Sequence, residues 1–181
     1  MTLRSSQESV VKKAVIEEFV PRFAAQSTLL HLRNPYPFRS SSWEERLEGI
    51  GISRPAFNSL PDLVLLDDKR EWVFFVEAVH SFGPITPARL ETLEALCAGC
   101  RLSPVFVSAF FDRDSFRKFA LSIAWDTTVW IAQEPDHTIH FDGGHFLGPR
   151  ATSFRESPCF SSPKHAVSFG DALLKPPAEL Y

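Results

Sequence analysis

The segment PDLVLLDDKREWVFFVEAVH, residues 61–80, decides how the rest of the chain is interpreted. Two apolar runs of strand length, residues 63–66 and 72–76, flank a polar turn rich in Asp, Lys and Arg. This pattern predicts a β-hairpin. Asp62 precedes the first run and Glu77 follows the second. Because the chain folds back at the turn, the hairpin brings both acids to one end of the strand pair.

Two neighbouring carboxylates are typical of a site for a hard divalent cation. Mg²⁺ is usually held by one or two protein carboxylates, while phosphate oxygens and water complete its octahedron. Metal-dependent nucleases use such an ion to polarise a phosphate and to activate water. The alternative is that Asp62 belongs to ordinary loop punctuation and that Glu77 simply faces water, since short motifs often occur by chance.

Four blocks follow in order after the start of this hairpin, at residues 77–84, 106–113, 123–132 and 135–149. Together they resemble the catalytic domain of the BsuBI/PstI restriction endonucleases. Pro61 and Asp62, followed by Glu77 at the end of a strand, resemble the pattern of the PD-(D/E)xK nuclease superfamily. The BsuBI/PstI enzymes cut duplex DNA within a short palindrome with Mg²⁺. The resemblance to them is close over residues 60–149 and looser in the first helix, at residues 17–23.

The resemblance implies a role for several residues of the hairpin. Asp62 and Glu77 would bind Mg²⁺, for which Mn²⁺ can substitute, and the carbonyl group of Ala78 would be a further ligand. The superfamily has a lysine two residues after the Glu, but this chain has Val79, which cannot titrate. The missing catalytic role then falls to His80, to Arg89 or to a second metal-bound water, and histidine is well suited to proton transfer near neutral pH. The alternative is that His80 only caps the turn or fills a packing position.

Two acids on the first helix, Glu17 and Glu18, are further candidates. In the nuclease superfamily an acid from this helix often contacts the metal or its water. The alternative is a solvated helix face, which adjacent glutamates favour.

Basic residues that could contact DNA phosphates occur in two places. Arg89 lies in the first turn of a predicted helix, where a cation opposes the helix dipole. Arg113, Arg117 and Lys118 form the densest basic group of the chain. For both places a plain solvated surface is the alternative. The net charge is −3, so DNA binding would depend on such local patches and not on bulk positive charge.

The order of predicted elements indicates an α/β fold, with one central mixed β-sheet flanked by helices. This order also fits the restriction-endonuclease-like fold. A first helix is predicted from the capping box at Ser5 to about Val20, where Pro21 would end it. A second capping box at Ser42 would open a short helix, and Thr86 with Pro87 would begin another that ends near Gly99. The remaining predictions are a helix over residues 114–125, capped by Asp112 or Asp114, and strands over residues 28–33, 104–110, 127–132 and 138–141.

Composition and length predict one domain. Of the 181 residues, 44% are hydrophobic and 23% are charged, which is ordinary for a globular domain. Residues 1–150 would form the nuclease domain, and residues 151–181 a loosely structured tail that packs on it. The start of the chain lacks a signal-peptide core, and no apolar run is long enough to cross a membrane, so a cytoplasmic protein is expected.

Full restriction enzymes of this group carry an additional N-terminal domain, and almost nothing precedes the first helix here. We therefore expect a homodimer or a partner subunit to supply target recognition, in a restriction or phage-defence role on double-stranded DNA. The alternative function is that of a catalytically impaired nuclease-fold module that binds DNA or a protein partner.

Overall fold

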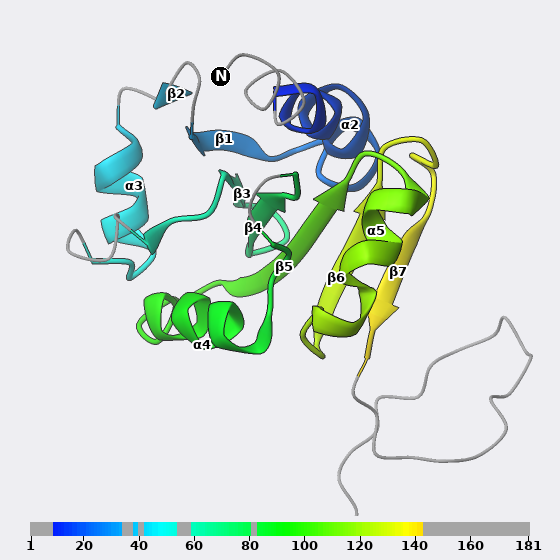
Figure 1. Ribbon diagram of the computed structural model, residues 1–181. Coiled ribbons are helices and arrows are strands. Elements are labelled where there is room, and N and C mark those ends of the chain that lie inside the picture. Colours follow the sequence, from blue (N-terminus) through cyan, green and yellow to red (C-terminus); the bar gives the residue numbers. More distant parts are fainter. Residues whose placement is uncertain (1–8, 34–37, 40–41, 54–58, 81–82, 143–181) are drawn as a thin grey trace, which may run out of the picture. The chain divides into compact units, whose positions relative to one another are not determined.

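In the computed structural model, the described residues form a seven-stranded mixed sheet flanked by helices (Figure 1). The described residues are 9–33, 38–39, 42–53, 59–80 and 83–142. The strands lie in the order β2-β1-β3-β4-β5-β6-β7. Their bounds are Thr28–Leu32 (β1), Phe38–Arg39 (β2), Leu63–Asp67 (β3), Trp72–Ala78 (β4), Ser103–Phe110 (β5), Thr127–Ile131 (β6) and Thr138–Phe141 (β7).

The predicted hairpin is formed by β3 and β4, which lie near the middle of the sheet. The two strands pair antiparallel, with Leu63 opposite Val76 at the end away from the turn. Asp62 and Glu77 directly flank this pair, so both acids lie at the same end of the hairpin. On the other side, β4 pairs parallel with β5, and β5 pairs parallel with β6.

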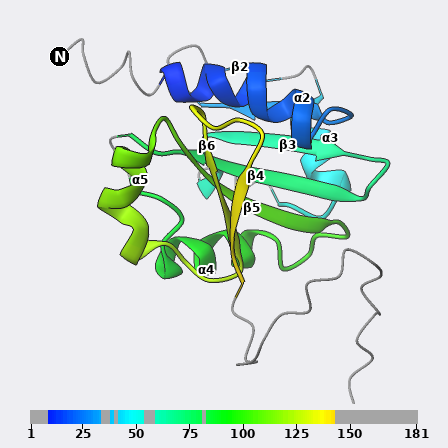
Figure 2. The same ribbon diagram turned by 90° about the vertical axis from the view of Figure 1, so that its right-hand side faces the viewer.

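Helices cover both faces of the sheet, as Figure 2 shows for the first helix and α4. The first helix (residues 9–23) buries Val11, Val15 and Phe19 against one face. Helices α3 (Trp43–Gly49) and α4 (Pro87–Leu96) cover the other face. Because side chains alternate along a strand, each of β3 and β4 contributes to both cores. The predicted α/β fold is confirmed.

The first helix extends past the proline that was predicted to end it. Residues 9–14 are α-helical, Val15–Phe19 form a π-helix, and α2 continues over Val20–Phe23. In the π-helical segment the Val20 N–H donates to the Val15 carbonyl, five residues earlier. A proline ring clashes with the carbonyl of residue i−4 in a regular α-helix, and the wider turn just before Pro21 accommodates it.

Two further expectations about helix ends are corrected. The Ser42 side chain makes no capping hydrogen bond, so the capping box predicted there does not form. Helix α5 (Arg113–Phe119) is shorter than expected, because a 3-10 turn over Ala120–Ser122 replaces its last part. The short strand β2 has no counterpart among the predicted strands.

Two predicted helix starts are confirmed. The Thr86 hydroxyl group accepts a hydrogen bond from the Arg89 backbone N–H at the start of α4, with Pro87 at the first helical position. Asp112 caps α5 in a reciprocal capping box with Ser115. The predicted capping box at Ser5 and the predicted tail over residues 151–181 lie outside the described residues. Within those residues, no helix is both long enough and apolar enough to span a membrane.

Candidate active site

The end of the β3–β4 hairpin holds the two acids together through the backbone. Asp62 precedes β3, and its Oδ2 accepts a hydrogen bond of 3.0 Å from the N–H of Ala78, at the end of β4. This contact fixes the Asp62 carboxylate next to the residue that follows Glu77. The structure therefore brings the two predicted metal ligands to the same end of two central strands.

Glu77 is paired with Arg89, which projects from the first turn of α4. Its Oε1 accepts from Arg89 Nε at 2.8 Å and lies 2.7 Å from an Arg89 terminal nitrogen. The Thr86 cap sets where α4 begins and so places Arg89 opposite the strand end. A cation in the first turn of a helix opposes the helix dipole, and the carboxylate of Glu77 compensates for it.

Glu77 lies in an environment that disfavours its negative charge. Burial, and then the neighbouring charge of Asp62, raise the pKa of Glu77 above its ordinary value, while Arg89 and Arg33 act in the opposite direction. Two carboxylates that repel each other in a largely buried site are a setting in which a bound cation is favourable.

Lys12 is the site residue that the sequence interpretation missed. Its Nζ lies 3.0 Å from Asp62 Oδ1 and donates to the Arg33 carbonyl at 2.6 Å. The Lys12 side chain is only 4% exposed. The sequence did contain a sign that Lys12 is buried, because position 12 shares a helix face with the buried residues Val15 and Phe19. A lysine on an apolar face indicates a buried, paired charge.

Arg33 joins the end of β1 to this corner. Its backbone N–H donates to the Asp62 carbonyl at 2.7 Å, and its guanidinium group donates to the Leu60 carbonyl. Asp62 is thus held by Lys12 and Ala78 through its side chain and by Arg33 through its backbone. The fixed position suits a metal ligand, since ligating carboxylates are themselves hydrogen-bonded.

The donor set fits Mg²⁺ in type and number. Among the described residues there is no group of three or more His, Cys, Asp and Glu side chains that could hold a metal. Mg²⁺ does not require one, because one or two carboxylates with water and substrate oxygens suffice. Asp62 and Glu77 would supply those two carboxylates, and this role stays a prediction. The carbonyl of Ala78 as a third ligand also stays a prediction.

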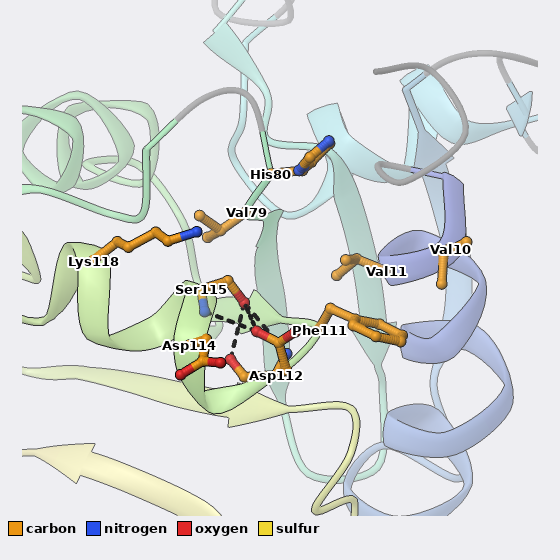
Figure 3. A pocket seen from close by; sticks show the side chains of 9 residues that line it. All are labelled: Val10, Val11, Val79, His80, Phe111, Asp112, Asp114, Ser115 and Lys118. Carbon is orange, nitrogen blue, oxygen red and sulfur yellow. Dashed lines mark hydrogen bonds between the residues drawn. The ribbon is translucent and has the colours of Figure 1, made fainter. Parts of the chain in front are cut away.

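A cavity of about 310 Å³ is lined by Val79 and His80, which follow Glu77 in the sequence (Figure 3). It is bounded by the start of the first helix, the end of β4 and the start of α5, and its lining includes neither Asp62 nor Glu77. His80 lines this cavity, and its Nε2 is buried without a hydrogen-bond partner among the residues that the structure describes. A catalytic role for His80 stays a prediction. The lining residues are Val10, Val11, Val79, His80, Phe111, Asp112, Asp114, Ser115 and Lys118.

The predicted DNA-binding residues of α5 lie at the protein surface. Arg113 donates to both carboxylate oxygens of Glu134, in the turn after β6. Arg117 lies 3.8 Å from Asp114, and Lys118 lines the cavity. Their contact with DNA stays a prediction.

Glu17 and Glu18 are engaged in exposed ion pairs. Glu17 lies 3.7 Å from Lys13, and Glu18 lies 2.6 Å from Arg22, which also pairs with Asp136. These contacts are typical of a solvated helix face, and a metal-binding role for either acid stays a prediction. The first helix contacts Asp62 through a base, Lys12.

Comparison with known proteins identifies the family. Residues 1–144 match the family described as the BsuBI/PstI restriction endonuclease domain. The chain belongs to this family. The resemblance inferred from the sequence blocks is therefore confirmed.

Two curated relatives and one solved structure are similar to this BsuBI/PstI family member. The type II restriction enzyme BsuBI of Bacillus subtilis is 34% identical over 143 residues, which are 79% of this chain and 45% of BsuBI. The type II restriction enzyme AplI of Arthrospira platensis is 28% identical over 149 residues, 77% of this chain and 45% of AplI. The structure of SdaI restriction endonuclease matches with a TM-score of 0.70 and 36% identity, over 78% of this chain and 45% of SdaI. The chain thus spans about half the length of these proteins.

Proposed function

We propose that this chain is a metal-dependent endonuclease that hydrolyses phosphodiester bonds of double-stranded DNA, in a restriction or phage-defence role. The observation that carries the proposal is the contact between Asp62 Oδ2 and the Ala78 N–H, which sets both acids at one end of the hairpin. Membership in the restriction endonuclease family supports the same reaction.

Asp62 and Glu77 would hold Mg²⁺, or Mn²⁺ in its place, with the carbonyl of Ala78 as a further ligand. When bound, such an ion polarises the scissile phosphate and lowers the pKa of a coordinated water. Arg89 orients the Glu77 carboxylate through two of its nitrogens. Lys12 and the Ala78 N–H orient the Asp62 carboxylate. The chain therefore presents both ligands in fixed positions.

DNA phosphates would be bound by the basic residues near the site and on α5. Arg117 and Lys118 are suited to this role, because Arg117 is exposed and Lys118 extends along the cavity toward Val79 (Figure 3). Arg89 and Arg113 already pair with Glu77 and Glu134, so each would contact phosphate from within an ion pair.

Target recognition would require a homodimer or a partner subunit. The matched relatives are named type II restriction enzymes. A two-fold assembly suits cleavage of both strands of a palindrome.

The test is cleavage of plasmid DNA by the purified chain with Mg²⁺ or Mn²⁺. We expect nicked or linear DNA that disappears with EDTA and in Glu77→Ala. The Asp68→Ala variant is a matched control. Asp68 is an exposed acid that follows β3, and in the contacts of the described residues it pairs only with Arg46. Metal-independent cutting, or cutting that survives in Asp62→Ala with Glu77→Ala, would contradict the site assignment.

A non-catalytic module that binds DNA or a protein partner is the second candidate. The apolar, buried Val79 at the superfamily lysine position favours it. Binding of duplex DNA without cleavage in any divalent metal, by the correctly folded chain, would support this alternative.

A further inference from the structure

Lys12 is buried beside its exposed neighbour Lys13 on the same helix. The Lys13 side chain is 70% exposed and lies 3.7 Å from Glu17. Lys12 instead reaches past the apolar stripe of the helix to the end of the hairpin, where its Nζ meets Asp62 and the Arg33 carbonyl. Two adjacent lysines thus occupy opposite environments.

Stability alone does not account for a buried ammonium group. Replacing a buried ion pair by apolar side chains of similar volume is often neutral or stabilising, because the desolvation of both charges offsets their attraction. Lys12 is buried on the same helix face as Val15 and Phe19, which belong to the apolar core. The placement of its charge at Asp62 therefore suggests a chemical role.

The two cations at the site are not equivalent. Arg89 directs two nitrogens of a planar group at one oxygen of Glu77. Lys12 carries a compact ammonium group with three rotatable donors, and its contact is with the other acid. Val79, the residue that follows β4, is buried and has no side-chain donor. Lys12 thus brings an ammonium group to the acid end of the hairpin, where Val79 brings none.

We propose that Lys12 is a further catalytic residue of this site, an inference that rests on the proposed nuclease function. The Lys12 ammonium group, held by Asp62 and the Arg33 carbonyl, donates a hydrogen bond to the attacking water and offsets the negative charge that develops on the phosphate. The water oxygen forms a bond to phosphorus while the bond to one ester oxygen breaks. The water releases a proton to solvent, the leaving oxygen takes one up, and Lys12 keeps its own proton throughout.

The test compares Lys12→Met and Lys12→Arg with wild type, with Lys13→Met as the matched control. The readouts are hydrolysis of plasmid DNA and of bis(p-nitrophenyl) phosphate, a small phosphodiester that requires no sequence recognition, together with calorimetric titration of Mn²⁺ and thermal unfolding. We expect both Lys12 variants to lose about a hundredfold or more in turnover. Mn²⁺ affinity should stay within about threefold in Lys12→Arg, and it should stay or increase in Lys12→Met, because a positive charge beside Asp62 is removed. Lys13→Met should match wild type in every readout.

Lys12→Arg keeps the proposal testable if Lys12→Met does not fold. Arginine keeps the positive charge beside Asp62 but replaces the compact ammonium group by a planar one, so wild-type turnover in Lys12→Arg would overturn the catalytic role. Parallel loss of Mn²⁺ binding and turnover in Lys12→Arg would also overturn it, because Lys12 would then only hold Asp62 in position. Failure of the nuclease function itself gives a different result, in which wild type and Glu77→Gln are equally inactive on both substrates.

Discussion

The candidate active site and helix α5 both pair acids with bases, but in opposite environments. The Lys12–Asp62 pair has side chains that are 4% and 11% exposed, whereas those of Arg117 and Asp114 are 80% and 84% exposed. Surface pairs contribute little to stability and are screened by salt. Buried pairs are costly to form and costly to break. The buried pair therefore holds its two groups in a fixed geometry, whereas the exposed pair on α5 contributes little to stability and leaves its charges accessible to a ligand.

The largest expected effect is the loss of cleavage on removal of either acid of the site. Asp62→Ala or Glu77→Ala removes a proposed metal ligand, and with it we expect a loss of several kcal/mol of transition-state stabilisation. This corresponds to a decrease of about a thousandfold or more in turnover. The measurement is the initial rate of plasmid cleavage at saturating Mg²⁺, with circular dichroism to show that the variants fold. An Asp114→Ala variant on α5 should keep the wild-type rate. Equal losses of rate in all three variants would show that the acids at the hairpin end have no special role in cleavage.

The next effect is on the free energy of unfolding. Lys12→Met leaves Asp62 buried without its cation, and we expect a loss of about 3–5 kcal/mol. Arg117→Met breaks an exposed pair, for which we expect at most about 1 kcal/mol. Urea unfolding of both variants without metal measures the difference. Similar losses for the two would show that burial does not separate these pairs.

A smaller effect is expected on DNA affinity. The logarithm of the DNA-binding constant falls as the logarithm of the salt concentration rises, and each phosphate contact removed makes this slope shallower by about 0.9. We expect Arg117→Ala with Lys118→Ala to reduce this slope by one to two such steps and to leave thermal stability unchanged. Fluorescence anisotropy with duplex DNA in Ca²⁺ over a series of salt concentrations is the measurement. An unchanged slope would assign α5 to an ordinary solvated surface.

The smallest expected effect is a pH dependence at the start of α5. Hydrogen bonds from the Ser115 side chain and backbone hold the pKa of Asp112 below its ordinary value. A lowered folded-state pKa means that the contribution to stability is present above the unfolded-state pKa and is lost as pH falls through the folded-state pKa. Asp112→Asn keeps a capping side chain and should make stability less dependent on pH below about 4. Unfolding midpoints measured between pH 2 and pH 6 would test this, and unchanged acid sensitivity would contradict the assignment.

The hairpin end could be predicted from sequence because its signals are local. Two apolar runs joined by a short polar turn fix the register, and the observed pairing of Leu63 with Val76 places the flanking acids as expected. The caps at Thr86 and Asp112 are likewise local contacts over three residues. Short-range geometry of this kind is contained in the spacing of residues.

The partners of the acids could not be predicted, because they depend on how distant elements pack. Lys12 meets Asp62 across 50 residues only after the first helix has packed on the sheet. Arg89 was expected to take over the missing catalytic role, to contact phosphate or to lie on a plain surface. Its pairing with Glu77 depends on how α4 lies beside β4. The continuation of the first helix past Pro21 depends on the π-helical turn, which apolar periodicity does not reveal. The sequence thus placed the two acids at one end of the hairpin, but it did not show that Lys12 and Arg89 pair with them.

The most direct test of a metal site shared by Asp62 and Glu77 is a calorimetric titration of Mn²⁺ into the wild-type chain and into its Asp62→Asn and Glu77→Gln variants. Shared coordination by Asp62 and Glu77 predicts one ion per chain in wild type and at least about tenfold weaker binding in each variant. Binding that is equally strong in all three proteins, or absent from wild type in the presence of duplex DNA, would contradict a metal site at the end of the hairpin.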